Sequence, residues 1–411
     1  MKKKITSILV VLMLFSIVMA KPKVKLGIDV LEDRNFDILQ GKRVGLITNP
    51  TGVSQDLRST VDILFEAPGV DLVALYGPEH GVRGNFGAGD KVDDALDPVT
   101  GVKAYSLYGK RNRPTSESLE DIDVLVFDIQ DIGCRSYTYI STMGRCMEAA
   151  AENNVEFVVL DRPNPLTGNI VEGATVKDGF YSGVSAYKIP YVHGLTVGEL
   201  AKVYNEENLL RDGVKCDLTV VPMKGWRRKM SFDDTGLNWV PSSPHIPEGN
   251  TAPYYVSTGI LGELYQLNIG IGYTIPFKTY AAEWINSQEL ADAMNALELE
   301  GVIFRPISYK PYYGVDQGKE LEGVQIHITD FTKVELMYLQ FRFLEVHHEL
   351  YPEHDFFEKA KHRWNMFDKV CGTDEIRIEF TKNYKFEDIK PIFERDVNEF
   401  KEMSKKYYLY R

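Results

Sequence analysis

The chain has 411 residues, which is enough for two domains that each bury a core. Hydrophobic residues make up 44% and charged residues 26%, a composition typical of globular proteins that excludes the collagen-like and disordered classes. The formal net charge of −12 disfavours nucleic acid as a partner, because an acidic surface repels phosphates.

Residues 1–20 have the pattern of a secretory signal peptide. Lysines at 2–4 precede an apolar stretch over 5–19, and Val18 and Ala20 occupy the positions that a signal peptidase favours before its cut. The apolar stretch is shorter than the ~20 residues that span a bilayer. We therefore expect an exported protein, periplasmic or secreted, without stable membrane insertion after cleavage.

Four short apolar runs occur in the first half of the chain. They lie at residues 44–47, 72–75, 124–127 and 157–160. None alternates with polar residues, which is typical of strands buried on both faces of a parallel sheet. Helical patterns near 57–65 and from Thr138 onward lie between them. This alternation predicts an α/β domain with a doubly wound, Rossmann-like parallel sheet.

Polar residues follow each apolar run. These are Asn49 after the first, Glu79 and His80 after the second, Asp128, Gln130 and Asp131 after the third, and Asp161 and Asn164 after the fourth. In open parallel sheets the ligand crevice lies outside the carboxyl ends of the strands. The four ends therefore predict a binding site along one rim.

Glu79 is a candidate general acid. Gly77 and Gly81 flank it, and glycines let a backbone turn tightly and approach a ligand closely. A carboxyl group in a partly desolvated crevice can have its pKa raised enough to donate a proton. The alternative is a turn with solvated polar side chains.

The segment after the third run carries groups that bind sugars. It contains Asp128, Gln130, Asp131, Arg135, Tyr137 and Tyr139. Carboxylates, amides and guanidinium groups bind sugar hydroxyls, aromatic rings stack on sugars, and an arginine can hold a carboxylate with two hydrogen bonds. The alternative is a salt-bridged loop that caps the following helix.

Glycosidases usually require a pair of carboxylates. Glu172 and Asp128 are the candidates for the second one, although Glu172 by itself is equally compatible with a surface position. The sequence does not give the separation of the carboxylates, so a retaining and an inverting mechanism both remain open. His193 is a candidate site residue or a helix cap.

We expect no metal and no cofactor, because the histidines are too scattered for any metal-ligand spacing. The four cysteines, Cys134, Cys146, Cys216 and Cys371, contain no CxxC pair. Disulfides and four free thiols both remain open.

The second half predicts further elements. A helix over 194–210 has Thr196 as its N-cap with Glu199 at the capping-box spacing, and a strand follows at 218–223. A passage rich in proline and serine begins at residue 239 and marks the domain boundary. We expect an N-terminal domain over 21–238 and a smaller α+β domain over 239–411. Helices are expected at 287–297, at 333–349 and after residue 390, with a strand at 324–328 and the final tyrosines packed back on the body.

Four segments resemble the motifs of the bacterial exo-β-N-acetylmuramidase family. They are residues 77–81, 127–133, 137–140 and 161–165, and the resemblance extends over nearly the whole mature chain. It implies a Rossmann-like domain, a smaller α+β domain and a site in the cleft between them. It further implies exo-acting release of N-acetylmuramic acid from the non-reducing end of peptidoglycan fragments, with a peptidoglycan-derived glycan as partner.

The resemblance assigns Glu79 as the main catalytic carboxylate and Glu172 and Asp128 as site carboxylates. The expected substrate contacts are Asn49, His80, Gln130, Asp131, Arg135, Tyr137, Tyr139, Asp161, Asn164, His193 and Glu263.

The sequence departs from the family pattern at three positions. Ile269 and Ile271 stand where a glutamate and an arginine are expected, and His245 replaces an asparagine. The alternative to an active glycosidase is therefore a weakly active or inactive relative that binds cell-wall glycans in the envelope. The oligomeric state is not predicted.

Overall fold

The structure, a computed structural model, describes residues 24–79, 81–84, 94–109 and 111–411. The expected signal peptide at 1–20 and the candidate site residue His80 lie outside these ranges. Within the same ranges, no helix is long and apolar enough to cross a membrane.

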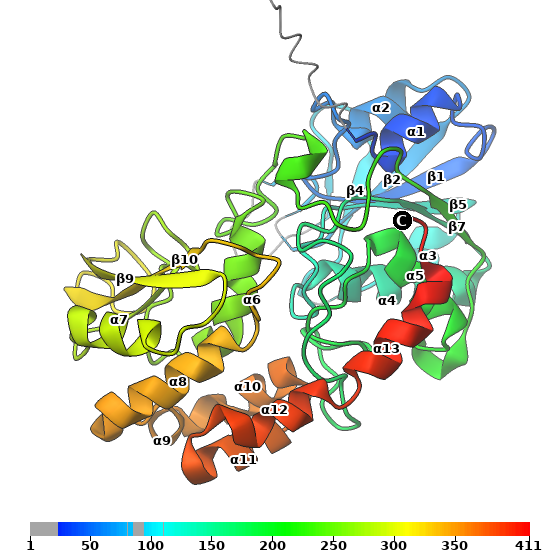
Figure 1. Cartoon of the computed structure of the whole chain (residues 1–411). Helices are drawn as coiled ribbons and strands as arrows, with labels where there is room; N and C mark the ends of the chain where they lie inside the picture. Colours follow the sequence, from blue (N-terminus) through cyan, green and yellow to red (C-terminus); the bar gives the residue numbers. More distant parts are fainter. Residues whose placement is uncertain (1–23, 80, 85–93, 110) are drawn as a thin grey trace, which may run out of the picture.

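A seven-stranded sheet forms the centre of the N-terminal half (Figure 1). Its order is β3-β4-β2-β1-β5-β6-β7, and all neighbours are parallel except β3 and β4. The strands are β1 (Arg43–Thr48), β2 (Asp71–Gly77), β3 (Ala95–Leu96), β4 (Lys103–Ser106), β5 (Val124–Asp128), β6 (Glu156–Leu160) and β7 (Leu218–Val221). All five strands expected for this half are confirmed, and the two short strands at one end of the sheet, β3 and β4, were not expected.

Helices cover both faces of this sheet. One face carries α1 (Gly27–Asp33) and α2 (Thr60–Glu66), and the other carries α3 (Ser116–Leu119), α4 (Tyr139–Asn153) and α5 (Val197–Glu206) (Figure 1). Val44 and Leu46 of β1 pack in the core under α1 and α2, whereas Ile47 packs in the core under α3 to α5. Both sides of each strand are therefore apolar, which explains why the runs show no alternation.

The predicted start of α5 is confirmed. The Thr196 hydroxyl accepts a hydrogen bond from the Glu199 backbone N–H at 3.3 Å, and the Glu199 carboxylate accepts one from the Thr196 N–H at 3.2 Å. This reciprocal pair is a capping box, which satisfies two N–H groups that the helix itself leaves unpaired.

The rest of the chain forms a smaller α+β part, as expected. Its antiparallel sheet has the order β8-β10-β9. The elements are α6 (Thr251–Gly262), β8 (Thr279–Ala282), α7 (Ser287–Asn295), β9 (Val302–Tyr309), β10 (Leu321–Ile328), α8 (Leu339–Leu350), α9 (Phe356–Lys359), α10 (Trp364–Cys371), α11 (Glu375–Asn383), α12 (Phe386–Glu394) and α13 (Val397–Ser404). The helix expected from residue 333 begins only at Leu339, and α6 was not expected. The domain boundary between 238 and 239 stays a prediction.

The end of the chain returns to the N-terminal sheet (Figure 1). The Tyr410 hydroxyl donates to Asp161 at 2.5 Å and accepts from the Met223 backbone N–H at 2.9 Å. The Arg228 guanidinium carbon lies 3.3 Å from the centre of the Tyr408 ring. The expected packing of the terminal tyrosines on the body is therefore confirmed.

The four cysteines are buried free thiols. Of the alternatives that the sequence leaves open, the structure therefore has the unpaired one.

Replacement of Tyr410 by phenylalanine should destabilise the protein. Burial raises the pKa of Asp161 to about 7, and the variant removes one of the donors that oppose this effect. We expect Tyr410→Phe to lower the free energy of unfolding by roughly 1–3 kcal/mol, measured by urea denaturation. The matched control is Tyr181→Phe, because Tyr181 is 45% exposed. Equal urea midpoints for the two variants would show that the terminal hydrogen bond contributes nothing.

Candidate active site

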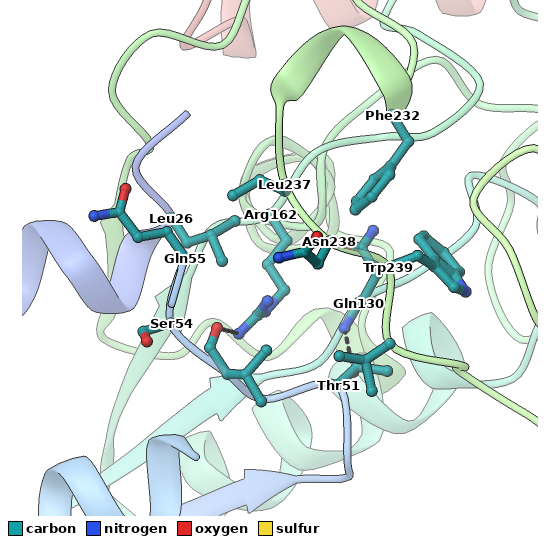
Figure 2. Close-up of a pocket in the computed structure, with 12 residues that line it drawn as sticks. Leu26, Thr51, Ser54, Gln55, Gln130, Arg162, Phe232, Leu237, Asn238 and Trp239 are labelled. Atoms are coloured by element: carbon teal, nitrogen blue, oxygen red, sulfur yellow. Dashed lines mark hydrogen bonds between the residues drawn. The ribbon is translucent and has the colours of Figure 1, made fainter. Parts of the chain in front are cut away.

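A buried ion pair joins the carboxyl ends of β5 and β6. Arg162 donates from Nε and Nη2 to the two oxygens of Asp128 at 2.5 and 2.9 Å, and Thr60 donates to the same carboxylate. Nη2 also donates to the Val53 carbonyl oxygen at 2.8 Å, in the loop after β1 (Figure 2). Both side chains are almost fully buried. Asp128 therefore holds three strand ends together, with both of its oxygens bound by the protein.

A small, shallow pocket opens beside this ion pair, with room for little more than a water molecule between its walls (Figure 2). Its walls come from the loops after β1, β5 and β6 and from the passage that follows β7. The lining residues are Leu26, Thr51, Val53, Ser54, Gln55, Gln130, Arg162, Phe232, Leu237, Asn238, Trp239 and Val240. The pocket therefore lies at the point where the chain order of the sheet reverses around β1, the usual ligand position in such folds.

Glu79 is the second residue after the end of β2 and is half-buried. Burial and then the charge of Glu79 raise the pKa of the Tyr108 hydroxyl, which also hydrogen-bonds to this carboxylate. Burial raises the pKa of Tyr139 well above its usual value, and the nearby charge of Glu79 adds to the effect. Glu79 thus lies near two tyrosines and keeps partial access to solvent.

Tyr137 and Tyr139 are held by the passage after β7. The Tyr137 hydroxyl donates to Ser242 Oγ at 2.7 Å, and the Tyr139 hydroxyl donates to the Ser242 carbonyl oxygen at 2.6 Å. The two rings meet edge to face with centroids 5.0 Å apart. Ser242 therefore links the passage after β7 to the surroundings of Glu79.

Asp131 and His193 face each other in the interior, 3.7 Å apart. His193 Nδ1 accepts a hydrogen bond from the Leu195 backbone N–H, so the proton of a neutral ring lies on Nε2, toward Asp131. Asp131 Oδ2 accepts from the Gly133 backbone N–H at 2.6 Å. Asp131 Oδ1 and His193 Nε2 are buried without a hydrogen-bond partner among the described residues.

The side-chain amides of Gln130 and Asn49 differ in their hydrogen bonds. Gln130 Nε2 donates to the carbonyl oxygens of Asp131 and Pro163, both at 2.7 Å. Asn49 Oδ1 accepts from the backbone and the hydroxyl of Thr51. The buried Asn49 Nδ2 faces the Tyr139 hydroxyl, where it opposes the rise in the pKa of that tyrosine, so it is engaged by the protein at the end of β1.

Arg135 lies in the protein interior, away from the strand-end pocket. Its guanidinium donates to Ser185 Oγ and to three carbonyl oxygens, at distances of 2.7 to 3.1 Å. One of these carbonyls belongs to Val370 in α10, so the arginine joins the two halves of the protein. A substrate carboxylate could reach this group only if these bonds broke, so the structure gives no support to the expected contact.

Glu172 is likewise engaged by the protein. Its two oxygens accept from the backbone N–H groups of Leu336 and Met337, at 3.2 and 2.8 Å. Burial raises the pKa of this carboxyl to about 7, against the effect of the two N–H donors. Glu172 lines a different hollow from the one beside Arg162, between the loop at 169–172 and helices α12 and α13.

The remaining predicted site residues also make structural contacts. Asp161 accepts from the Gly198 N–H and the Thr196 hydroxyl, which places it at the start of α5. Asn164 donates to the Leu195 carbonyl oxygen. In the C-terminal half, Glu263 pairs with Arg363 at 2.7 Å, and burial raises the pKa of Glu263.

The residues that depart from the family pattern are accommodated by packing. Ile269 is 6% exposed and lies against Gly262, where a Cβ atom would come within 2.7 Å of its side chain. Ile271 is partly buried against the core. The His245 ring stacks on Tyr313, with Nε2 3.1 Å from the tyrosine hydroxyl.

The sequence reasoning missed three residues of this region, namely Arg162, Tyr108 and Ser242. Arg162 could have been found from the sequence, since it directly follows Asp161 at the end of a predicted strand. Tyr108 and Ser242 could not, because they reach Glu79 and the tyrosines only through the tertiary fold.

Loss of Arg162 should destabilise the protein strongly. Arg162→Met leaves Asp128 as an uncompensated buried charge, which typically costs about 3–5 kcal/mol in unfolding free energy. Arg58→Met is the control, since Arg58 forms its ion pairs at the surface, where such pairs contribute little. Urea unfolding measures both variants, and similar losses would contradict the central role of the buried pair.

Glu172 should make stability depend on pH. Its folded pKa of about 7 exceeds the ordinary value of 4.5, so its contribution is complete below about pH 4.5 and is lost as the pH rises through 7. We expect the free energy of unfolding to fall more between pH 5 and pH 8 in the starting protein than in the Glu172→Gln variant. Asp161 titrates in both proteins, so its contribution to the pH dependence of the unfolding free energy is the same in both and cancels in the comparison. Parallel pH profiles would show that Glu172 does not titrate in this range.

Comparisons with known proteins agree with this architecture. Models of the N-terminal and C-terminal parts of exo-β-N-acetylmuramidase NamZ match residues 44–250 and 253–410. A Bacillus subtilis (strain 168) protein named peptidoglycan β-N-acetylmuramidase NamZ is 44% identical over 423 residues, covering 100% of both chains.

Two crystal structures of DUF1343 family proteins from Bacteroides fragilis NCTC 9343 are also similar. One is 56% identical with a TM-score of 0.91, covering 95% of this chain and 99% of its own. The other is 29% identical with a TM-score of 0.73, covering 94% and 99%. The chain therefore belongs to the exo-β-N-acetylmuramidase family, along both of its halves.

Proposed function

We propose that the protein is an exo-acting glycosidase that releases N-acetylmuramic acid from the non-reducing end of peptidoglycan fragments. Membership of the family along both halves of the chain and the printed activity of the Bacillus relative support this function. The observation that carries it in the structure is Glu79, a half-buried carboxylate at the rim of the sheet.

Glu79 differs from the other two candidate carboxylates in how the protein uses its oxygens. Of the three candidate carboxylates, Asp128 is bound by Arg162 and Thr60, and Glu172 is bound by backbone N–H groups. Glu79 retains solvent access, so a glycosidic oxygen can approach it. In the proposed reaction Glu79 protonates this oxygen as its bond to the anomeric carbon breaks, and a water molecule supplies the new hydroxyl on that carbon and returns a proton to the Glu79 carboxylate.

The neighbouring polar groups would contact the sugar or hold the rim in place. Gln130 lines the pocket after β5 and is a polar side chain that a sugar could contact there. Asn49, Tyr137 and Tyr139 are buried, and Ser242 holds both tyrosine hydroxyls. We therefore assign these three residues to positioning the rim around Glu79.

We also propose that the protein acts outside the cytoplasm. The lysines at 2–4 and the following apolar stretch support export, and the peptidoglycan fragments that the family cleaves come from the envelope. Amino-terminal sequencing of the exported protein would find a start after Ala20.

Glu79→Gln should remove most of the activity. The amide cannot supply a proton, so we expect hydrolysis of a chromogenic N-acetylmuramic acid β-glycoside to fall about 10²- to 10⁴-fold. The free energy of unfolding should stay within roughly 0.5 kcal/mol of the starting protein, because the side chain is near the surface. The control Glu120→Gln changes an exposed glutamate and should retain full activity.

Two outcomes would count against these assignments. Turnover of the N-acetylglucosamine analogue but not of the muramic substrate would overturn the proposed specificity. Retention of full activity in Glu79→Gln would overturn the role of this carboxylate.

A further inference from the structure

A ladder of tyrosines rises to the surface beside the small antiparallel sheet. Tyr309 is buried, and its ring stacks on Tyr273 with centroids 4.9 Å apart. Tyr273 in turn lies 6.4 Å from Tyr312, with ring planes only 16° apart. Tyr312 is 76% exposed and its neighbour Tyr313 is 50% exposed. We call Tyr273, Tyr312 and Tyr313 the tyrosine platform.

The backbone holds this platform in a defined position. The Tyr312 N–H donates to the Gly272 carbonyl oxygen at 2.8 Å. Gly272 has a φ of 89°, and a Cβ atom there would lie 1.9 Å from the Tyr313 carbonyl oxygen, so only glycine fits. Asn268 Nδ2 fixes the same region by donating to the Val315 carbonyl oxygen. Exposed aromatic rings on such an ordered backbone indicate a binding surface.

The platform lies close to the candidate active site. Tyr313 stacks on His245 and approaches its Nε2 to 3.1 Å. His245 is three residues after Ser242, which binds Tyr137 and Tyr139. Three residues of extended chain span at most roughly 11 Å. The platform therefore lies within a short distance of the rim, on the side of the C-terminal sheet.

We propose that the tyrosine platform binds the sugars of the glycan chain that follow the terminal unit. This inference rests on the proposed function. An exo-acting enzyme places the terminal sugar at its catalytic carboxylate, so the rest of the chain must leave across the adjoining surface. Pyranose rings have an apolar face that stacks on aromatic rings, and tyrosine adds a hydroxyl for hydrogen bonding. The platform offers both groups on the surface beside the site.

The test compares a short and a long substrate. The short one is the chromogenic muramic glycoside, and the long one is a peptidoglycan-derived tetrasaccharide with N-acetylmuramic acid at its non-reducing end. Tyr312→Ala should lower the ratio of kcat/KM for the long to the short substrate about tenfold, the effect of losing one well-placed aromatic contact. Tyr312→Phe keeps the ring and should largely keep the ratio. Tyr181→Ala is the control, because Tyr181 is an exposed tyrosine of the N-terminal half.

A binding measurement tests the contribution of the platform to glycan affinity without substrate turnover. Calorimetric titration of the tetrasaccharide into Glu79→Gln should give an affinity about tenfold higher than into the double variant with Tyr312→Ala. An unchanged ratio and affinity in Tyr312→Ala would overturn the inference, and so would an equal loss on both substrates. A change of oligomeric state in Tyr312→Ala would overturn it too, because the rings would then join two copies of the chain. If the starting protein binds the tetrasaccharide through Tyr312 but cleaves neither substrate, the proposed function fails and the platform stands.

Discussion

The buried ion pair between Asp128 and Arg162 is the interaction on which the candidate site depends. It ties the ends of β5 and β6 to the loop after β1, at the point where the order of the sheet reverses. Two charges removed from water are favourable only when their geometry is good and their remaining hydrogen-bonding groups are used. Here the carboxylate also accepts from Thr60, and the guanidinium also donates to a carbonyl oxygen. The rim is therefore rigid before any ligand arrives, while Glu79 on the neighbouring strand keeps its access to solvent.

Buried polar contacts also set the position of the two halves relative to each other. Arg135 reaches from the segment after β5 to a carbonyl of α10, and Glu172 reaches to the backbone before α8. Both residues follow motifs that resemble the family pattern, and the polar groups of both side chains bind the other half of the protein. Residues beside a motif of the candidate site can therefore hold the two halves of the protein together.

The sequence predicted the central sheet well, because each strand is an uninterrupted apolar run between turns. It did not predict β3 and β4, since these are short and partly exposed and carry no such run. Glu79 could be proposed as a site residue from its glycine-flanked position after a strand. The structural roles of Arg135, Asp161 and Glu172 could not be predicted. The sequence shows a charged residue in a motif, but it does not show whether the partner of that residue is a ligand or a distant backbone group. Only the tertiary fold supplies those partners.

The return of the chain end to the first sheet has a consequence for biogenesis. Asp161 and Glu199 lie in the N-terminal half, yet each takes a hydrogen bond from the last three residues of the chain. Ribosomes make the amino-terminal half first, and domains generally fold in that order. In this protein the first half lacks two of its internal donors until residues 409 and 410 have been made. Chains truncated before Leu409 should therefore be more loosely folded and more open to proteolysis, because Asp161 and Glu199 lose donors that only this distant segment supplies.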